Sequence, residues 1–276
     1  MAVATLRSTV RLNCGARMPM FGLGCTPTER GGETVRAVGA ALAAGYRLID
    51  TASVYENEAD VGRALRSTAI PRADIFLSTK VWNSDLGYDR TLAAFDRSLE
   101  LLGVEYVDLY LIHWPLIRLR RESWRALGKL LEDGRCRAIG VSNFAIRHLE
   151  EIVSETGSVP AVNQVEFNPF LNQRRLHEWC RRKDILLQTH TPLSRHLRRR
   201  ARHLHEMAER YGKSISQLMV RWALQKGVGV LVRTLDPAEI AEQADVFDFE
   251  ISLRDIDTMD SLHANLRVGW DPTNAP

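Results

Sequence analysis

Short runs of hydrophobic, often β-branched residues alternate along the chain with longer stretches whose apolar residues recur at helical spacing. The short runs are apolar almost throughout, which is typical of parallel strands buried on both faces. The predicted strands are Met18–Gly24, Tyr46–Asp50, Ile75–Lys80, Tyr106–Ile112, Cys136–Val141, Ala161–Val165, Ile185–Thr189 and Val228–Val232. The predicted helices are Glu33–Ala44, Glu58–Leu65, Arg90–Leu102, Glu122–Glu132, Ala145–Val153, Arg174–Arg182, Ala201–Tyr211 and Ile215–Lys226.

Eight strand–helix units in 276 residues predict an α/β fold, a single closed (β/α)8 TIM barrel. No linker rich in Pro, Gly or Ser divides the chain, so residues 1–276 are predicted to form one domain. Residues Ser8–Met18 are predicted to form a hairpin that turns at Gly15 and closes the bottom of the barrel. The segment around Trp270 is predicted to form a C-terminal loop over the active site.

Composition and charge narrow the class of protein. The 37 basic and 34 acidic side chains leave a net charge of only +3, which argues against a dedicated nucleic-acid binder. The four cysteines form no CxxC pair and are expected to be free thiols in a reducing compartment. Neither a signal peptide nor an apolar run of the ~18 residues needed to span a membrane is recognisable. We therefore expect a cytoplasmic monomer that acts on a small molecule.

Polar residues stand where the predicted strands end. Asp50 ends the second strand, Lys80 ends the third, His113 follows the fourth, and Tyr55 lies in the loop after Asp50. In (β/α)8 barrels these strand ends converge on one mouth, where active sites are built. Each residue alone could be a hydrogen-bonded loop residue, but an acid, an ammonium, a phenol and an imidazole at one mouth indicate a catalytic site.

Three segments carry a resemblance to a known family. They are Gly45–Ala52 with the following Tyr55–Glu58, Leu101–Pro115, and Ala138–Phe144. Together they resemble the aldo-keto reductases, including their diketogluconate reductase-like and glyoxal reductase-like members, from about Val10 to Trp270. The resemblance implies an NAD(P)-dependent carbonyl reductase without a Rossmann fold, and no GxGxxG motif follows any predicted strand.

The resemblance implies that Asp50, Tyr55, Lys80 and His113 form the catalytic tetrad. Tyr55 would donate the proton to the substrate oxygen, although a free phenol with a pKa of ~10 is a poor acid. Lys80 is expected to favour the tyrosinate, Asp50 to hold Lys80, and His113 to orient the substrate. The alternative for Lys80 is a Schiff-base lysine, which explains neither Tyr55 nor the other motifs.

Cofactor contacts follow from the same resemblance. Ser142, Asn143 and Gln164 are expected to bond a nicotinamide carboxamide. His190 replaces the tyrosine that the family stacks on the nicotinamide, and the alternative is an ordinary loop histidine. The further cofactor contacts expected are Gly24, Cys25, Asp50 and Leu193.

The residues after the eighth strand bear on the choice of cofactor. Arg233 and Thr234 stand where the family has a lysine and a serine that hold the adenosine 2′-phosphate. Glu239 replaces an arginine, and its carboxylate would repel that phosphate and could accept from a ribose hydroxyl. We expect NADPH, with NADH possible.

The substrate pocket is expected to be aromatic. Trp82 and Trp114 would wall it beside His113, whereas Cys25 and Thr26 stand where many members have a further aromatic residue. The loop after the fourth strand is basic, so an anionic substrate is conceivable, although a surface loop explains it equally well. Its basic residues are Arg118, Arg120 and Arg121.

A run of basic residues stands apart. The segment Arg195–Arg202 holds five arginines and no acid. It could clamp a cofactor pyrophosphate or form a solvated basic face. The nearby His205–Glu209 lacks the second histidine of a zinc-protease helix, so no metal is expected. The predicted function is NADPH-dependent reduction of aldehydes or ketones, and the alternative is a regulatory barrel that senses the cofactor.

Overall fold

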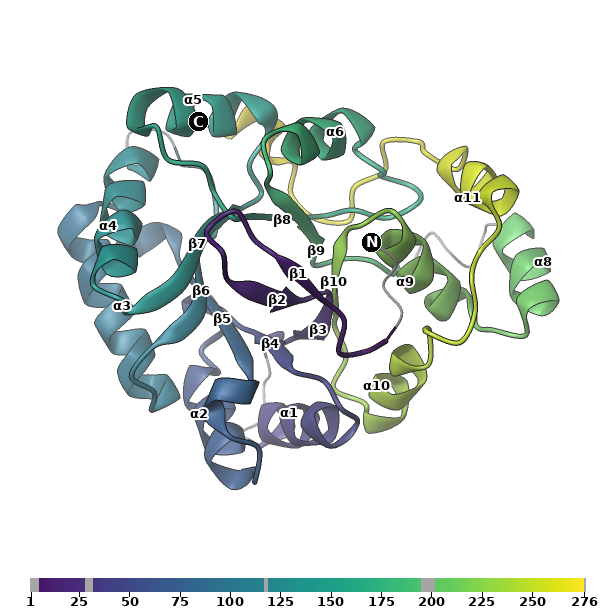
Figure 1. Ribbon diagram of the computed structural model, residues 1–276, viewed down its shortest axis with the longest axis horizontal. Helices are drawn as coiled ribbons and strands as arrows, with labels where there is room; N and C mark the ends of the chain where they lie inside the picture. The colour runs from purple at the N-terminus through teal and green to yellow at the C-terminus, as the bar shows by residue number, and fades with distance from the viewer. Residues whose placement is uncertain (1–4, 28–31, 117–118, 195–201, 276) are drawn as a thin grey trace.

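Eight parallel strands close into a barrel in the computed structural model, which describes residues 5–27, 32–116, 119–194 and 202–275. The strands follow one another around the barrel in chain order, and the last pairs with the first (Figure 1). Each predicted strand is confirmed within a few residues at its ends. The barrel strands are β3 Phe21–Gly24, β4 Leu48–Asp50, β5 Phe76–Val81, β6 Val107–Ile112, β7 Cys136–Ser142, β8 Val162–Val165, β9 Leu186–Thr189 and β10 Gly229–Val232.

Helices surround the barrel and confirm the predicted alternation (Figure 1). Two α-helices among the described residues were not predicted, α10 and α11. Each begins at an ordinary capping residue: Asp236 accepts from the backbone N–H of Ala238, and Ser252 accepts from that of Asp255. The helices are α1 Glu33–Ala43, α2 Glu58–Ser67, α3 Tyr88–Leu102, α4 Arg120–Glu132, α5 Ile146–Thr156, α6 Arg174–Arg182, α8 Arg202–Tyr211, α9 Ile215–Gln225, α10 Pro237–Ala244 and α11 Leu253–Asp260.

The predicted N-terminal hairpin lies across one end of the barrel (Figure 1). Its strands are β1 Thr9–Arg11 and β2 Arg17–Pro19, and Gly15 turns the chain at a φ of +90°. Leu12 and Met18 of the hairpin join a buried apolar cluster with residues inside the barrel. The hairpin therefore plugs the end at which the barrel strands begin.

The interior of the barrel changes character toward the opposite end. Ser78, Gln164 and Gln188 are fully buried there, and the Gln164 Nε2 donates to Gln188 Oε1 at 3.0 Å. Buried polar groups persist where they find partners, so this hydrogen-bonded layer is a preformed polar floor. The floor lies beneath the strand ends at which the sequence predicts the site.

Two further expectations from the sequence concern the cysteines and membrane-spanning segments. All four cysteines are free thiols, as expected. Within the described ranges, no helix has both the length and the apolar character needed to cross a bilayer.

Candidate active site

A buried ion pair forms the centre of the mouth. Asp50 ends β4 and Lys80 lies in the neighbouring β5, and the Lys80 Nζ is 2.5 Å from Asp50 Oδ2. The same ammonium donates to the backbone carbonyl of Thr51 at 2.7 Å. The Lys80 side chain is 0 % exposed. Desolvating two ions is costly and is repaid only by close geometry, so each ion depends on the other.

The second oxygen of Asp50 is also occupied. Its Oδ1 accepts from the Ser78 hydroxyl at 2.6 Å and from the Gln164 amide at 3.1 Å. Every one of these partners donates, which is the environment that suits a charged carboxylate. Gln164 is therefore part of the polar floor, in addition to being an expected cofactor contact.

Tyr55 lies beside this pair in the short 3-10 helix η1 (Ser53–Tyr55). The Ser53 hydroxyl donates to the carbonyl of Lys80 at 3.0 Å, which ties η1 to β5. The Lys80 Nζ lies 5.4 Å from the centroid of the Tyr55 ring. Arg233 Nη2 also donates to the Tyr55 hydroxyl, at 3.4 Å. The phenol thus faces two cations.

His113 completes the predicted group of four. Its ring meets Tyr55 edge-on, with centroids 5.7 Å apart, and Trp82 edge-on at 5.1 Å. Burial, together with the charges of Lys80 and Arg233 and the neighbouring His190, holds the pKa of His113 well below its usual value. Its buried Nδ1 has no hydrogen-bond partner among the described residues. The site therefore contains a neutral imidazole.

Three residues expected at a nicotinamide gather at the ends of β7 and β8. The Ser142 hydroxyl donates to the carbonyl of Gln164 at 2.8 Å, and Asn143 Nδ2 donates to the carbonyl of His113 at 3.0 Å. Asn143 adopts a φ of +64°, a left-handed conformation that asparagine tolerates better than most residues. This backbone turn aims the amide back across the mouth toward the tetrad.

His190 follows β9 and joins the same group. One ring nitrogen lies 3.3 Å from Asn143 Oδ1 and the other 2.7 Å from the Thr191 hydroxyl. Burial first, and then the charges of Arg233 and Lys80, lower the pKa of His190 to about 3. The imidazole is neutral at ordinary pH and presents a flat ring where the family resemblance expects a tyrosine.

The expected phosphate-binding residues follow β10. The Thr234 hydroxyl donates to Glu239 Oε2 at 2.6 Å and accepts from the backbone N–H of Asp236 at 3.1 Å. A Cβ placed on Gly24 would lie 3.2 Å from Arg233 Cγ, so the arginine stem packs directly on that glycine. The guanidinium therefore reaches from the rim toward Tyr55.

Two smaller residues complete the expected cofactor contacts. Cys25 and Leu193 are both buried. Burial, reinforced by the charge of Asp50, raises the pKa of the Cys25 thiol to about 12. Cys25 is consequently an inert, thiol-bearing wall residue rather than a nucleophile.

Aromatic side chains wall the outer part of the mouth. Trp114 stacks on His113 with centroids 6.5 Å apart, and Trp270 of the C-terminal segment lies 4.7 Å from Trp114. The sequence predicted all three of these residues near the site. It did not predict Glu166, which follows β8 and accepts from the backbone amides of Val268 and Gly269. A glutamate directly after a barrel strand was the available signal.

The suggestion of an anionic substrate bound by the basic loop is not supported. Arg120 is buried at the start of α4, where it pairs with Glu151 and donates to the carbonyl of Pro115 at 2.8 Å. Arg121 pairs with Glu155 at 3.1 Å. Both guanidiniums are occupied by helix-to-helix and helix-to-loop contacts. Arg118 lies outside the described residues.

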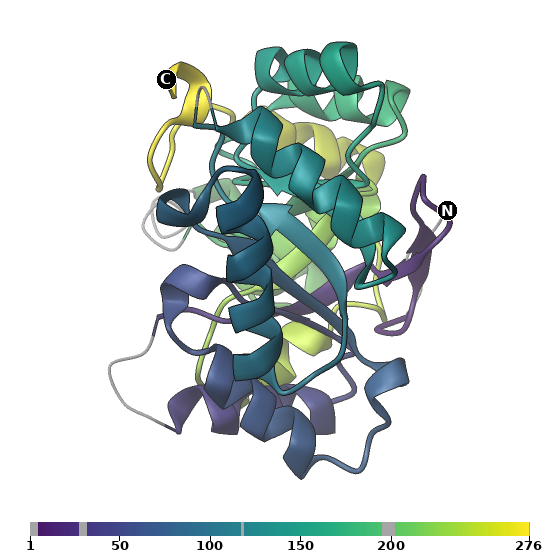
Figure 2. The same cartoon turned by 90° about the vertical axis from the view of Figure 1, so that its left-hand side faces the viewer.

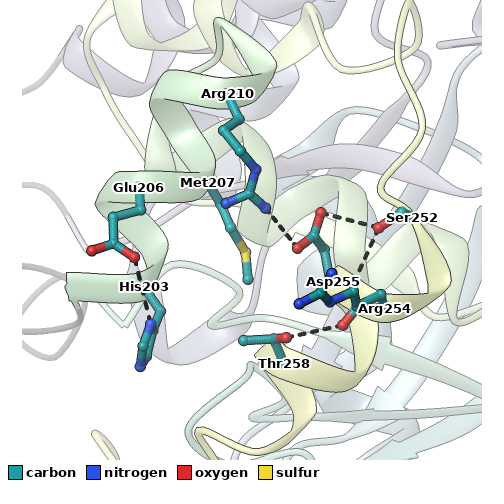
Figure 3. Close-up of a pocket in the computed structure, with 8 residues that line it drawn as sticks. All are labelled: His203, Glu206, Met207, Arg210, Ser252, Arg254, Asp255 and Thr258. Atoms are coloured by element: carbon teal, nitrogen blue, oxygen red, sulfur yellow. Dashed lines mark hydrogen bonds and ion pairs between the residues drawn. The ribbon is translucent and has the colours of Figure 1, made fainter.

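The basic run before α8 is largely outside the described residues. Its last arginine, Arg202, pairs with Glu206 one helical turn away at 2.7 Å. Near it, α8 and α11 enclose an open hollow of about 510 Å³, lined mostly by polar and charged side chains (Figure 3). Over the described ranges, no group of three or more His, Cys, Asp or Glu side chains could hold a metal ion.

Comparisons with known proteins agree with the geometry. The model of the aldo/keto reductase family matches residues 27–264. The glyoxal reductase of Bacillus subtilis is 45% identical over 268 residues, which cover 97% of each chain. An aldo/keto reductase structure from Brucella melitensis is 45% identical, with a TM-score of 0.89, covering 92% of this chain and 99% of that one. A mutant of Gox0644 in complex with NADPH is 37% identical, with a TM-score of 0.92, covering 98% and 99%.

The match spans most of the chain and includes the mouth of the barrel. Residues 27–264 contain all four members of the group at the mouth, Tyr55 and the buried Asp50, Lys80 and His113. The chain therefore belongs to the aldo/keto reductase family, whose members are NAD(P)H-dependent oxidoreductases.

Proposed function

We propose that this protein reduces aldehydes and ketones to alcohols with NADPH, and that Tyr55 donates the proton. The observation that carries the proposal is the placement of the Tyr55 phenol beside a fully buried ammonium. The Lys80 Nζ lies 5.4 Å from the ring and is fixed by Asp50 at 2.5 Å. A scaffold protein has no use for a desolvated ion pair aimed at a phenol.

The chain's residues fit a bound nicotinamide cofactor. A hydroxyl and two amides at the mouth, on Ser142, Asn143 and Gln164, suit a carboxamide, and the Arg233 guanidinium suits a phosphate. The flat His190 ring offers a stacking surface. Bound there, NADPH would supply a hydride to the carbonyl carbon of the substrate.

The remaining steps belong to the protein. The Tyr55 hydroxyl gives its proton to the carbonyl oxygen as negative charge develops there, so the product is an alcohol and the phenol becomes a phenolate. The Lys80 ammonium stabilises that phenolate, and Asp50 holds Lys80 in place. Neutral His113 donates a hydrogen bond to the same oxygen and orients it. Water then returns the proton to Tyr55.

We propose small dicarbonyl and sugar-derived carbonyl compounds as substrates. The tryptophans Trp82, Trp114 and Trp270 offer an apolar wall, whereas Cys25 leaves one side of the pocket less crowded than an aromatic residue would. The similarity to the glyoxal reductase of Bacillus subtilis supports this substrate class.

The preference for NADPH depends on two opposed charges. Arg233 favours a 2′-phosphate, while Glu239 holds the Thr234 hydroxyl at 2.6 Å and places a carboxylate beside it. We propose NADPH as the cofactor and expect NADH to bind measurably. In Glu239→Arg, the ratio of the Kd values for NADH and NADPH should rise about tenfold or more, because a charge-assisted bond replaces a repulsion. An unchanged ratio in fluorescence titrations would show that Glu239 does not contact this end of the cofactor.

The assay that tests the function is consumption of NADPH absorbance with glyoxal, methylglyoxal and an aldose. The proposal predicts turnover with at least one of these carbonyl compounds. Tight NADPH binding without turnover of any aldehyde would favour the alternative, a barrel that senses the cofactor.

We further propose that residues 1–276 form one domain and that the protein is a cytoplasmic monomer. Free thiols on all four cysteines suit a reducing compartment, and the near balance of basic and acidic residues suits a protein without a polyanionic partner. Gel filtration with light scattering tests the monomer, since a mass near twice 31.2 kDa would exclude it.

A further inference from the structure

The last part of the chain runs across the mouth with little regular structure. After α11, the described residues form only the short 3-10 helix η4 (Pro272–Asn274). Figure 2 shows this segment at the end of the barrel opposite the N-terminal hairpin. Three of its apolar side chains are exposed, and Trp270 is 55% exposed. Burial of side chains therefore contributes little to holding this segment in place. The exposed residues are Leu266, Val268 and Trp270.

Hydrogen bonds from the barrel hold the segment instead. The carbonyl of Phe170 accepts from the amides of Ala264 and Leu266, at 3.1 and 3.3 Å. Near the end of the chain, Arg147 of α5 donates to the carbonyl of Ala275 at 2.9 Å. Between these two points, the segment is tied to the barrel at Glu166.

Glu166 is a buried carboxylate that serves the segment directly. Its Oε1 accepts from the backbone N–H of Val268 at 2.8 Å, and its Oε2 accepts from that of Gly269 at 3.2 Å. The residue is only 5% exposed, and it makes no ion pair within the described part of the chain. Burying a carboxylate is costly unless strong donors meet it, so the two amides are its essential partners.

The amides bound by Glu166 immediately precede an aromatic wall residue. Trp270 follows Gly269 and lies 4.7 Å from Trp114, which in turn stacks on His113. Glu166 also follows β8 two residues after Gln164, so it is fixed to a strand that contributes to the floor of the site. The Glu166 side chain thus links the barrel to the backbone that positions the Trp270 indole.

We propose that Glu166 is a positioning residue that holds the Val268–Trp270 backbone over the mouth and so strengthens the binding of those carbonyl substrates that carry an aromatic or large aliphatic group. This inference rests on the proposed reductase function. Such substrates extend past Trp114 and contact the Trp270 indole, whereas a two- or three-carbon dicarbonyl stays beside Tyr55 and His113. Loss of the contact therefore weakens binding of large substrates selectively.

Amide hydrogen exchange tests the hydrogen bonds without any assay of activity. The amides of residues 268 and 269 should exchange slowly in the native protein. Exchange should become about tenfold faster or more in Glu166→Gln, which keeps only one acceptor oxygen, and faster still in Glu166→Ala. Glu155→Gln, which removes an exposed carboxylate on α5, is the matched control and should leave these amides unchanged. Equal exchange in all four proteins would overturn the proposal.

Steady-state kinetics test the consequence for specificity. For phenylglyoxal, KM should rise about tenfold in Glu166→Gln, the effect of losing one charge-assisted bond, while kcat stays within about twofold. For methylglyoxal, both constants should stay near those of the native protein. Equal changes for the two substrates would contradict the proposal.

A second variant keeps the test decisive if Glu166 variants fold poorly. Val268→Pro removes one donor from the exposed side and leaves the barrel untouched. On its own, Val268→Pro should raise the KM for phenylglyoxal and leave the KM for methylglyoxal near that of the native protein, because it removes one of the two amides that bind Glu166. Equal changes for the two substrates would overturn the proposal. If exchange follows the expected order but no carbonyl compound is reduced, the proposed function fails and Glu166 still holds the segment.

Discussion

The mouth of the barrel and the α8–α11 hollow each place a tyrosine beside a cation–carboxylate pair. At the mouth of the barrel, Lys80 and Asp50 are 2.5 Å apart, and their side chains are 0 % and 4% exposed. At the hollow between α8 and α11, Arg210 and Asp255 are 2.6 Å apart, but the arginine is 54% exposed (Figure 3). The two ion-pair distances are nearly equal, whereas the exposure of the charged side chains to solvent differs.

The phenols of Tyr211 and Tyr55 lie beside groups of opposite charge. Tyr211 donates its hydroxyl proton to Asp255 at 2.7 Å and accepts from the backbone N–H of Ser252 at 2.9 Å. Burial pushes the pKa of Asp255 up, but the bonds from Tyr211, Arg210 and Ser252 outweigh it and leave that pKa below its usual value. Tyr55 instead lies beside the ammonium of Lys80 and accepts from Arg233.

The contrast shows what makes a tyrosine chemically useful. A carboxylate that accepts a hydrogen bond from the phenol, as Asp255 does from Tyr211, does nothing to stabilise a phenolate. At Tyr55, the buried Lys80 ammonium beside the ring and the partly buried Arg233 guanidinium at the hydroxyl stabilise the negative charge that remains after the proton leaves. Water screens the exposed Arg210–Asp255 pair and is excluded from the Lys80–Asp50 pair, so nearly equal distances carry unequal energies.

Removing the cation from each cluster should give the largest difference. Lys80→Met leaves Asp50 buried without its ion partner and should lower the free energy of unfolding by about 3–5 kcal/mol. Arg210→Met removes an exposed partner and should cost about 0–1 kcal/mol. Urea denaturation of both variants measures the difference. Similar losses of stability in the two variants would mean that water reaches the ion pair at the mouth as freely as the ion pair at the hollow.

The titration of His113 sharpens the comparison further. Burial, with Lys80, His190 and Arg233, depresses its pKa, so the folded protein should resist protonation below the usual value of 6.5. The unfolded chain takes up that proton first, so this contribution to stability is complete above about pH 6.5 and is lost as the pH falls further. In NMR, the His113 ring should show a titration midpoint well below 6.5. A midpoint at 6.5 or above would indicate a solvated mouth.

Tyr211→Phe should have a small effect on stability and almost none on activity. It removes the bond to Asp255 and the acceptor for Ser252, at a cost of about 1–2 kcal/mol in the free energy of unfolding. Reductase activity should remain within about twofold, because the α8–α11 hollow takes no part in the proton transfer. Thermal denaturation and an NADPH assay on the same preparation check both expectations.

Much of the fold could be predicted because its signals are local. Eight apolar runs and their intervening helices fixed the barrel, and Gly15 marked the turn of the hairpin. The helices α10 and α11 were missed although Asp236 with Pro237, and Ser252, are ordinary start signals. The first of these was interpreted as a phosphate-binding segment, which concealed its helical character.

The site was predictable in its members but not in all its contacts. Strand ends and family motifs identified Asp50, Lys80 and their neighbours. The reach of Arg233 to Tyr55, across 178 residues of sequence, depends on packing that no local pattern encodes. The same holds for Arg120, which looked like a loop residue and is a buried partner of Glu151.

The central claim is that the Tyr55 hydroxyl delivers the proton to the reduced carbonyl. The most direct test compares the rate of NADPH oxidation by methylglyoxal in Tyr55→Phe and Tyr211→Phe, two variants that each lose one phenolic hydroxyl. The account predicts that kcat falls by at least about 100-fold in Tyr55→Phe alone, while the Kd for NADPH is unchanged. Full activity in Tyr55→Phe, or an equal loss in both variants, would contradict it.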